Sequence, residues 1–143
     1  MAPLLNYGKT LLPAATITVA GTFATDPISL GQISDTSAVL AAQATFVYGS
    51  GGTTCKSWVQ TSLDGGLTWI DIASFAFTTV TATKVSVLSL YIATAAALTP
   101  TDGSLADNTI LNGLLGDRVR CKLTTTGTYG GNTTLALAMV TRG

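Results

Sequence analysis

Apolar and polar residues alternate with a period of two along most of this chain, which is the pattern of β-strands with one buried face. The segment 117–125 is the clearest example. Its apolar positions are expected to point into a core, and its basic positions, Arg118, Arg120 and Lys122, are expected to share the outer face. The pattern therefore predicts a strand of an antiparallel sheet in this segment.

Similar strand signals, separated by clusters of turn-forming residues, recur along the chain. The predicted strands are residues 16–20, 29–33, 37–48, 55–62, 68–77, 85–92, 117–125 and 133–141. About eight strands spaced in this way predict an all-β fold, namely an antiparallel β-sandwich that is jelly-roll-like. No repeat of fixed period is present, so a propeller or a solenoid is not favoured.

The segment 68–77 is apolar on both faces, which is typical of a strand that is covered from both sides. Simple alternation places Trp69, Asp71 and Phe75 on one face of this strand, with Ile72 on the other. We therefore expect it to lie inside a sheet with cover on both faces.

The alternation stops between residues 94 and 116, where Pro, Gly, Asn and Asp are frequent. This stretch predicts a long excursion from the sheets, with one helical turn at residues 109–115.

The first fourteen residues are too apolar for a solvated tail and too often interrupted by proline for a helix. They are predicted to form an N-terminal arm, residues 1–14, ahead of a sandwich domain, residues 15–143. Two roles remain open for the arm: docking on a neighbouring subunit, or folding back onto its own sandwich. In the first role, the contacts would be made by Leu4, Leu5, Tyr7, Leu11 and Leu12.

Charge is scarce and balanced in this chain. Only 10% of the residues are charged, and seven basic residues offset seven acidic ones to a formal net charge of zero. Nucleic-acid binding has no electrostatic support here, because phosphate neutralisation needs a basic excess. A neutral surface also lacks the self-repulsion that keeps monomers apart, so we expect a homo-oligomer, either a trimer or a dimer.

No membrane partner is expected either. The longest apolar-looking run, residues 85–98, contains polar interruptions and is shorter than the roughly 20 residues that a spanning helix needs. The first nine residues have no basic region ahead of an apolar stretch, so no secretory signal is predicted and synthesis is expected in a cytoplasm.

The side chains that usually carry catalysis are missing or isolated. His and Glu are absent, so a Ser or Cys nucleophile would have no imidazole partner. Cys55 and Cys121 lie in predicted strands and are interpreted as small core residues, with a cross-strand disulfide or a metal-ligand pair as the alternatives. Asp102 and Asp107 could gather oxygens around a cation, but turn formation explains both better. No enzyme activity, metal site or cofactor is predicted.

One turn has a specific signature. The segment 62–69 resembles an Asp-box, the S-x-D-x-G-x-T-W hairpin that recurs in sialidases and other β-propeller proteins. The fixed positions are Ser62, Asp64, Gly66, Thr68 and Trp69. The resemblance implies a structural role, in which the Asp64 carboxylate accepts hydrogen bonds from backbone amides and the indole packs under the turn.

A second resemblance covers most of the chain from about residue 58 to 142. The segments WVQTSLDGG (58–66), TWIDIA (68–73), FAF (75–77), TPTDG (99–103), LADNT (105–109), GDR (116–118) and TY (128–129) carry it. Together they are similar to small proteins encoded among phage and prophage structural genes. This resemblance implies a structural protein of the virion.

The function expected from these observations is that of a phage head decoration, or cement, protein. Its partners would be the major capsid protein or other virion proteins, and its location would be the virion. A head-to-tail connector or tail component is the alternative within that class. A carbohydrate-binding module is the alternative outside it, with Tyr48, Trp58 and Trp69 as the stacking platform.

The basic stripe formed by Arg118, Arg120 and Lys122 also has two interpretations. It can face an acidic partner surface, because like charges gathered on one strand need compensation. Alternatively it belongs to a solvated edge strand, where cations block unwanted strand pairing.

Overall fold

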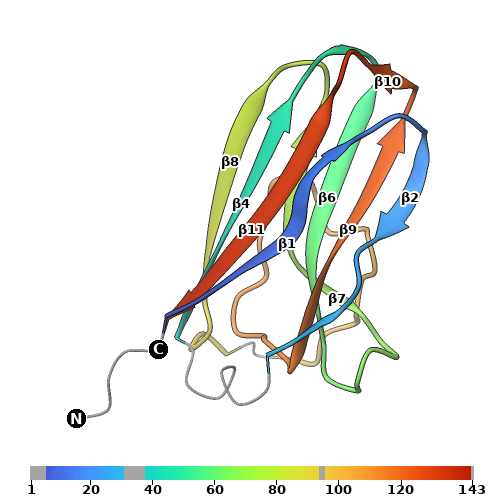
Figure 1. The fold of residues 1–143 in the computed structure, drawn as a ribbon. Coiled ribbons are helices and arrows are strands. Elements are labelled where there is room, and N and C mark those ends of the chain that lie inside the picture. The colour runs from blue at the N-terminus through green and yellow to red at the C-terminus, as the bar shows by residue number, and fades with distance from the viewer. Residues whose placement is uncertain (1–5, 31–37, 94–95, 143) are drawn as a thin grey trace.

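Two antiparallel sheets pack face to face in this protein and form a β-sandwich (Figure 1). The computed structural model describes residues 6–30, 38–93 and 96–142, and for residues 6–10 the backbone alone. Eleven strands and no helix occur in these ranges, so the predicted all-β fold is confirmed. No helix in the described part of the chain is long and apolar enough to cross a membrane.

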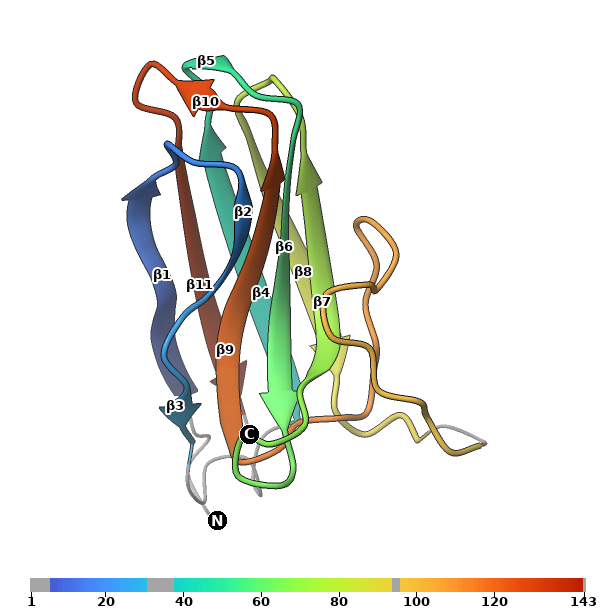
Figure 2. The same cartoon turned by 90° about the vertical axis from the view of Figure 1, so that its right-hand side faces the viewer.

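The first sheet, sheet A, has the strand order β1-β11-β4-β8. Its strands are β1 (Asn6–Thr16), β11 (Thr134–Arg142), β4 (Val39–Val47) and β8 (Ala82–Ser89). The first and last strands of the described chain are therefore neighbours, and β11 is inserted between β1 and β4 (Figure 2).

The second sheet, sheet B, has the order β2-β9-β6-β7, and a short strand β3 also pairs with β9. Its strands are β2 (Gly21–Ala24), β3 (Ile28–Ser29), β9 (Arg118–Thr126), β6 (Thr54–Ser62) and β7 (Ile70–Phe77). A two-stranded ribbon of β5 (Ser50–Gly51) and β10 (Tyr129–Gly130) closes one end of the sandwich.

The core lies between the two sheets and is built by the alternation that the sequence displays. On β9 the residues Val119, Cys121 and Leu123 are buried, whereas the basic residues between them face outward, as predicted. Large side chains from both sheets fill the centre, and the rings of Phe46 in sheet A and Phe77 in sheet B stack with their centroids 5.0 Å apart. Removing this apolar surface from water is the main force that holds the sheets together.

The predicted boundary after residue 14 falls inside β1. Residues 6–16 pair in antiparallel register with β11, and the Leu11 side chain is 3% exposed in the core. Pro13 is accommodated because β1 is an edge strand and its register shifts twice around this position. The described part of the segment therefore folds onto its own sandwich, while Leu4 and Leu5 lie outside the described residues.

Three local predictions were wrong in detail. A strand was expected at residues 16–20, but β1 already ends at Thr16. Residues 17–20 connect sheet A to sheet B and belong to no strand. The strand expected to run to residue 92 ends at Ser89, whose backbone bonds to residues 112 and 113 instead. Residues 109–115 form no helical turn, since Ile110 bridges to Ala73 at the edge of β7. Residues 31–37, which include the end of another predicted strand, lie outside the described residues.

Candidate functional site

A segment that we call the strap, residues 101–113, runs along the free edge of β7 (Figure 2), and its first half contacts side chains on the outer face of β6 and β9. Backbone hydrogen bonds join the amide of Asp71 to the carbonyl of Thr101 and the amide of Ser74 to the carbonyl of Thr109, both at 2.9 Å. The excursion predicted from the sequence is thus tied down along its length. It covers the part of the outer face of sheet B around Trp58 and Gln60, which are buried.

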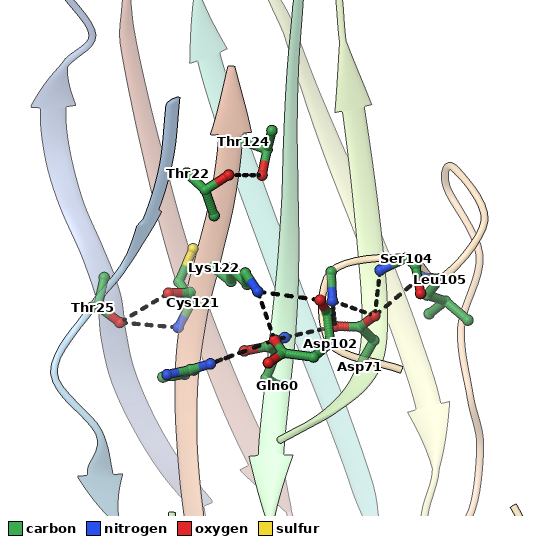
Figure 3. Close-up of polar contacts among 12 residues, drawn as sticks. Thr22, Thr25, Gln60, Asp71, Asp102, Ser104, Leu105, Cys121, Lys122 and Thr124 are labelled. Atoms are coloured by element: carbon green, nitrogen blue, oxygen red, sulfur yellow. Dashed lines mark hydrogen bonds and ion pairs between the residues drawn. The ribbon is translucent and has the colours of Figure 1, made fainter. Parts of the chain in front are cut away.

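The strap is anchored by one buried carboxylate. Asp71 is fully buried on β7, and its two carboxylate oxygens accept hydrogen bonds from the amides of Gly103, Ser104 and Leu105 at 2.9 to 3.0 Å (Figure 3). The side-chain amide of Gln60 donates a further bond of 2.8 Å. Backbone and side-chain donors together therefore solvate the buried charge, as a buried carboxylate requires.

Asp71 faces the strap because of a β-bulge. On β6, Val59 pairs with Ala73 and Gln60 pairs with Asp71, so Ile72 has no partner on that strand. A bulge of this kind reverses the facing of every residue beyond it. Simple alternation had placed Asp71 on the same face as Phe75, and this expectation is wrong: Phe75 lies in the core, and Asp71 points outward.

A second layer of contacts joins the strap to the basic stripe. The carboxylate of Asp102 lies 2.8 Å from the ammonium of Lys122 and 3.5 Å from the guanidinium of Arg120, and it accepts a bond of 2.7 Å from Gln60 (Figure 3). Gln60 in turn accepts a bond of 2.7 Å from Arg120. Burial raises the pKa of Asp102, but hydrogen bonds from Lys122 and Gln60 and the two nearby cations outweigh it, and the pKa lies below its ordinary value.

The basic stripe therefore has its acidic counterpart within the same chain. The side chains of Arg120 and Lys122 are only 16% and 19% exposed, and both form ion pairs with Asp102. The edge-strand interpretation is wrong, because β9 lies between β2 and β6 inside the sheet. Arg118 is half-buried at the start of β9, and its Nε has no hydrogen-bond partner among the described residues.

The remainder of the strap is fixed by polar contacts to β6, β7 and β8. The indole N–H of Trp58 donates to the carbonyl of Leu105 at 3.2 Å, and Lys56 forms an ion pair of 3.0 Å with Asp107. The Ser74 hydroxyl donates to the carbonyl of Ala106. Lys84 of β8 reaches the carboxamide oxygen of the strap's Asn108 at 3.1 Å and so ties the strap to sheet A.

The five residues of the Asp-box come together at the β6–β7 turn. The Asp64 carboxylate accepts bonds from the amide of Thr68 at 2.8 Å and from the hydroxyl of Ser62 at 2.9 Å, and that hydroxyl accepts from the amide of Gly66 at 2.9 Å. Hydrogen bonds from Thr68 and Ser62 lower the pKa of Asp64 to about 2. Trp69 is buried beside the turn, and the guanidinium of Arg120 stacks on its ring at 4.2 Å.

The aromatic residues considered as a stacking platform do not form one. Trp58 and Trp69 are 4% and 7% exposed, the first beneath the strap and the second behind the hairpin. Tyr48 packs instead against Phe46 and Tyr129, near the β5–β10 ribbon. Each ring thus serves packing in a different part of the molecule.

Both cysteines are buried free thiols in the core, as their positions in predicted strands indicated. In the β6–β9 register Cys55 pairs with Thr125 and Cys121 with Val59, so four residues separate them along the strands, a distance of about 13 Å. A disulfide between them is therefore excluded. Burial raises the pKa of each thiol to about 12. No cluster of three metal-ligating side chains occurs among the described residues.

Sequence reasoning missed the residues that organise this site. Asp71 and Gln60 were assigned to strands and Asp102 to a turn, without any contact among them. One signal was available: a lone carboxylate in the otherwise apolar segment 70–77 must be solvated by the protein itself. What solvates it lies about thirty residues further along the chain and has no pattern of its own.

The open edges of both sheets are protected. Pro13 and two register shifts interrupt β1, and Lys84 points inward from β8, its ammonium donating to a β7 carbonyl. The strap covers β7, and β2 and β3 are short. Edge-to-edge pairing with another chain is thereby disfavoured.

Besides Val19 and Phe23, which line a hollow of about 320 Å³ beside β2, the described residues present two exposed apolar surfaces. The first, which we call the apolar end, lies where β6 and β8 finish. Its residues are Leu63, Leu67, Tyr91, Ile92 and Leu98, which are 45% to 88% exposed. The second is the outer face of sheet A, on which Val39, Val47, Val85, Val87 and Val140 are exposed.

No protein-family model matches this chain, and no curated protein shows significant similarity to it. The functional assignment therefore rests on the residues and their geometry.

Proposed function

We propose that the protein is a structural component of a phage virion, specifically a head decoration protein that binds the outside of the assembled capsid. The segments that resemble products of phage structural genes supply Gln60, Asp71 and Asp102, the residues that fix the strap to sheet B. The resemblance thus involves the architecture of the molecule and not only its turns.

The observation that carries the proposal is the apolar end. Leu67 is 88% exposed and Tyr91 is 78% exposed on a chain that has few charges. Large apolar side chains gathered at one place on a protein mark a surface that another protein covers. Because hydrogen bonds of the Asp-box fix the turn that carries Leu63 and Leu67, little conformational entropy is lost when this turn docks.

Binding of this kind stabilises a shell by mass action. A subunit that attaches to the assembled lattice, and not to free capsid protein, shifts the equilibrium toward the assembled state. The role requires surface and rigidity, and it requires no catalytic group.

The strand order also supports assignment to the jelly-roll class. When the eight strands of four or more residues are numbered in sequence, sheet A reads 1-8-3-6 and sheet B reads 2-7-4-5. Successive strands alternate between the sheets except at the Asp-box hairpin, as in a long double ribbon wound into a barrel-like sandwich. Capsid proteins commonly use this architecture.

The proposal is tested with capsids of the encoding phage from which the protein has been removed. We expect added protein to co-sediment with them and to saturate at a copy number set by the lattice. The double variant Leu67→Lys/Tyr91→Lys should lose at least tenfold in affinity, whereas Val80→Lys, an exposed valine in the β7–β8 turn at the other end, should bind normally.

Three results would contradict the proposal: no co-sedimentation, saturation with a small ring of copies at one vertex, or normal binding by the double variant. The second would favour the connector alternative. Retention on a glycan column, without capsid binding, would favour the carbohydrate-binding alternative.

A further inference from the structure

We propose that two copies of this chain form a two-fold dimer through the outer faces of their A sheets. The inference does not depend on the virion role. It begins with an asymmetry of the sandwich: the strap covers part of the outer face of sheet B, over Trp58 and Gln60, while no described residue covers the outer face of sheet A.

The outer face of sheet A is almost free of charge. Across β8, β4 and β11 its central rows are Val87–Ala41–Val140, Val85–Gln43–Ala138 and Thr83–Thr45–Ala136. Among the described residues of these three strands whose side chains point outward, one is charged. It is Arg142, at the end of β11. Such a face meets a copy of itself without repulsion between like charges and without burying unpaired ions.

The edges of sheet A are protected against strand addition, whereas its outer face is not covered. Pro13 on β1 and the inward-pointing Lys84 on β8 oppose the addition of a strand at either edge. Association through this sheet is thereby directed to the face, where two sheets pack about 10 Å apart with their strands within about 30° of one another.

The outer face of sheet A has a ridge on one side and a hollow on the other, so its shape is complementary to that of a second copy. Val85 and Val87 form a ridge on β8 and are 60% and 58% exposed. On the opposite side, next to the bulged strand β1, the face has a hollow of about 210 Å³, lined by Pro13, Gln43 and Ala138 among others.

A two-fold axis that runs parallel to the strands exchanges the two sides of the sheet and keeps each residue at its height along the strands. Val85 lies in the same row as Gln43 and Ala138, so the ridge of one copy faces the hollow of the other, and the reverse holds as well. This reciprocity is what an isologous interface requires.

The area is sufficient for a reversible dimer. Four strands spaced about 4.8 Å apart and about nine residues long at 3.3 Å per residue present roughly 570 Å² per copy. Two copies bury on the order of 1,100 Å², which lies near the lower limit for specific protein interfaces. We therefore expect a dimer whose population depends on concentration.

Sedimentation equilibrium over a wide concentration range tests the proposal. The wild-type chain should fit a monomer–dimer equilibrium, and Val85→Lys should raise the dissociation constant at least tenfold. The matched control Val80→Lys adds the same charge at a valine that is 67% exposed in the β7–β8 turn, and it should change the constant less than twofold. Circular dichroism melts confirm that each variant is folded.

Mixing two variants tests the orientation. Ala138→Glu alone should also weaken the dimer, but an equimolar mixture with Val85→Lys should form a heterodimer in which Lys faces Glu. A wild-type chain that stays monomeric, equal constants for Val85→Lys and wild type, or no heterodimer in the mixture would each overturn the proposal. Capsid co-sedimentation is scored separately, so a dimer that binds no capsid would count against the virion role alone.

Discussion

Both carboxylate oxygens of Asp71 lie 2.9 Å from the amide nitrogen of Gly103, so a side chain near the start of β7 holds the backbone of a loop more than thirty residues away. The geometry resembles the capping of a helix N-terminus, in which a carboxylate satisfies several amides at once. Here it fixes the strap to sheet B, and it makes Asp71 the residue on which that face depends.

Replacing Asp71 with Asn should therefore release the strap. The amide group of Asn has one acceptor oxygen and one N–H₂ donor in place of two acceptors, so the new donor faces either the amide of Gln60 or the backbone amides of the strap, and the donors on that side lose their acceptor. We expect a loss of about 2–3 kcal/mol in the free energy of unfolding, measured in urea. Asp107→Asn, which removes a half-exposed ion pair with Lys56, is the control and should cost no more than about 1 kcal/mol. Equal effects of the two substitutions would contradict the anchoring role.

The destabilisation caused by Asp64→Ala should depend on pH. Because the folded-state pKa is lowered to about 2, the contribution of Asp64 is fully present above its ordinary pKa of 3.8 and is lost as the pH falls through about 2. Asp64→Ala should lower the melting temperature at pH 7, and the gap to wild type should shrink between pH 4 and pH 2. Asp26→Ala, at an exposed carboxylate, is the control. A gap that is unchanged at pH 2 would argue against the hydrogen bonds as its cause.

Leu11 and Leu12 distinguish an arm from a strand. Leu11 is 3% exposed in the core, and Leu12 is only partly buried. Leu11→Ala should lower the free energy of unfolding by about 2–5 kcal/mol, as for other buried leucines, and Leu12→Ala should cost less. Chemical denaturation of both variants measures this difference. If both are as stable as wild type, residues 6–16 do not contribute to the core.

Ser57 and Ser62 are both fully buried on β6, but only Ser62 has hydrogen-bond partners in the described structure. Ser57→Ala removes a hydroxyl whose desolvation is not compensated, so stability should stay the same or rise by up to about 1 kcal/mol. Ser62→Ala should instead destabilise the protein by about 1 kcal/mol or more. Thermal melts of the two variants provide the comparison, and destabilisation by Ser57→Ala would reveal a partner for its hydroxyl.

The two cysteine thiols should not react with thiol reagents in the native protein. With pKa values near 12, neither thiol forms appreciable thiolate at pH 8, and both are shielded from solvent. A thiol-specific chromogenic reagent should titrate no groups in the folded chain and two after denaturation without reductant. Titration of none after denaturation would mean that the thiols are oxidised.

The sequence was most informative where apolar and polar residues alternate without interruption along a whole strand. Alternation predicted β4, β6, β9 and β11 to within about two residues, because one face of each strand lies in the core. It failed at Ile72, where a bulge adds one residue and reverses the facing of Asp71. No local signal announces such a bulge, since it is set by pairing with β6.

The contacts of the strap and the N-terminal strand were missed for a related reason. Proline in the first fourteen residues was taken to exclude a helix and to favour an arm, yet an edge strand tolerates proline because one of its sides needs no donors. Asp102 was assigned to a turn from its neighbour Gly103, and its role depends on Gln60 and Lys122, which lie far from it in sequence. Contacts between distant segments leave no trace in a local pattern.

The insertion of β11 between β1 and β4 has a consequence for biosynthesis. Until residues 134–142 have left the ribosome, β1 and β4 have no common neighbour, and the core residues Leu40, Phe46 and Leu88 lack the cover that Leu135, Leu137 and Met139 provide. Sheet A therefore cannot close progressively during translation, and the nascent chain leaves these core residues uncovered until β11 emerges. An assembly-competent surface on sheet A therefore appears only after residues 134–142 have emerged from the ribosome.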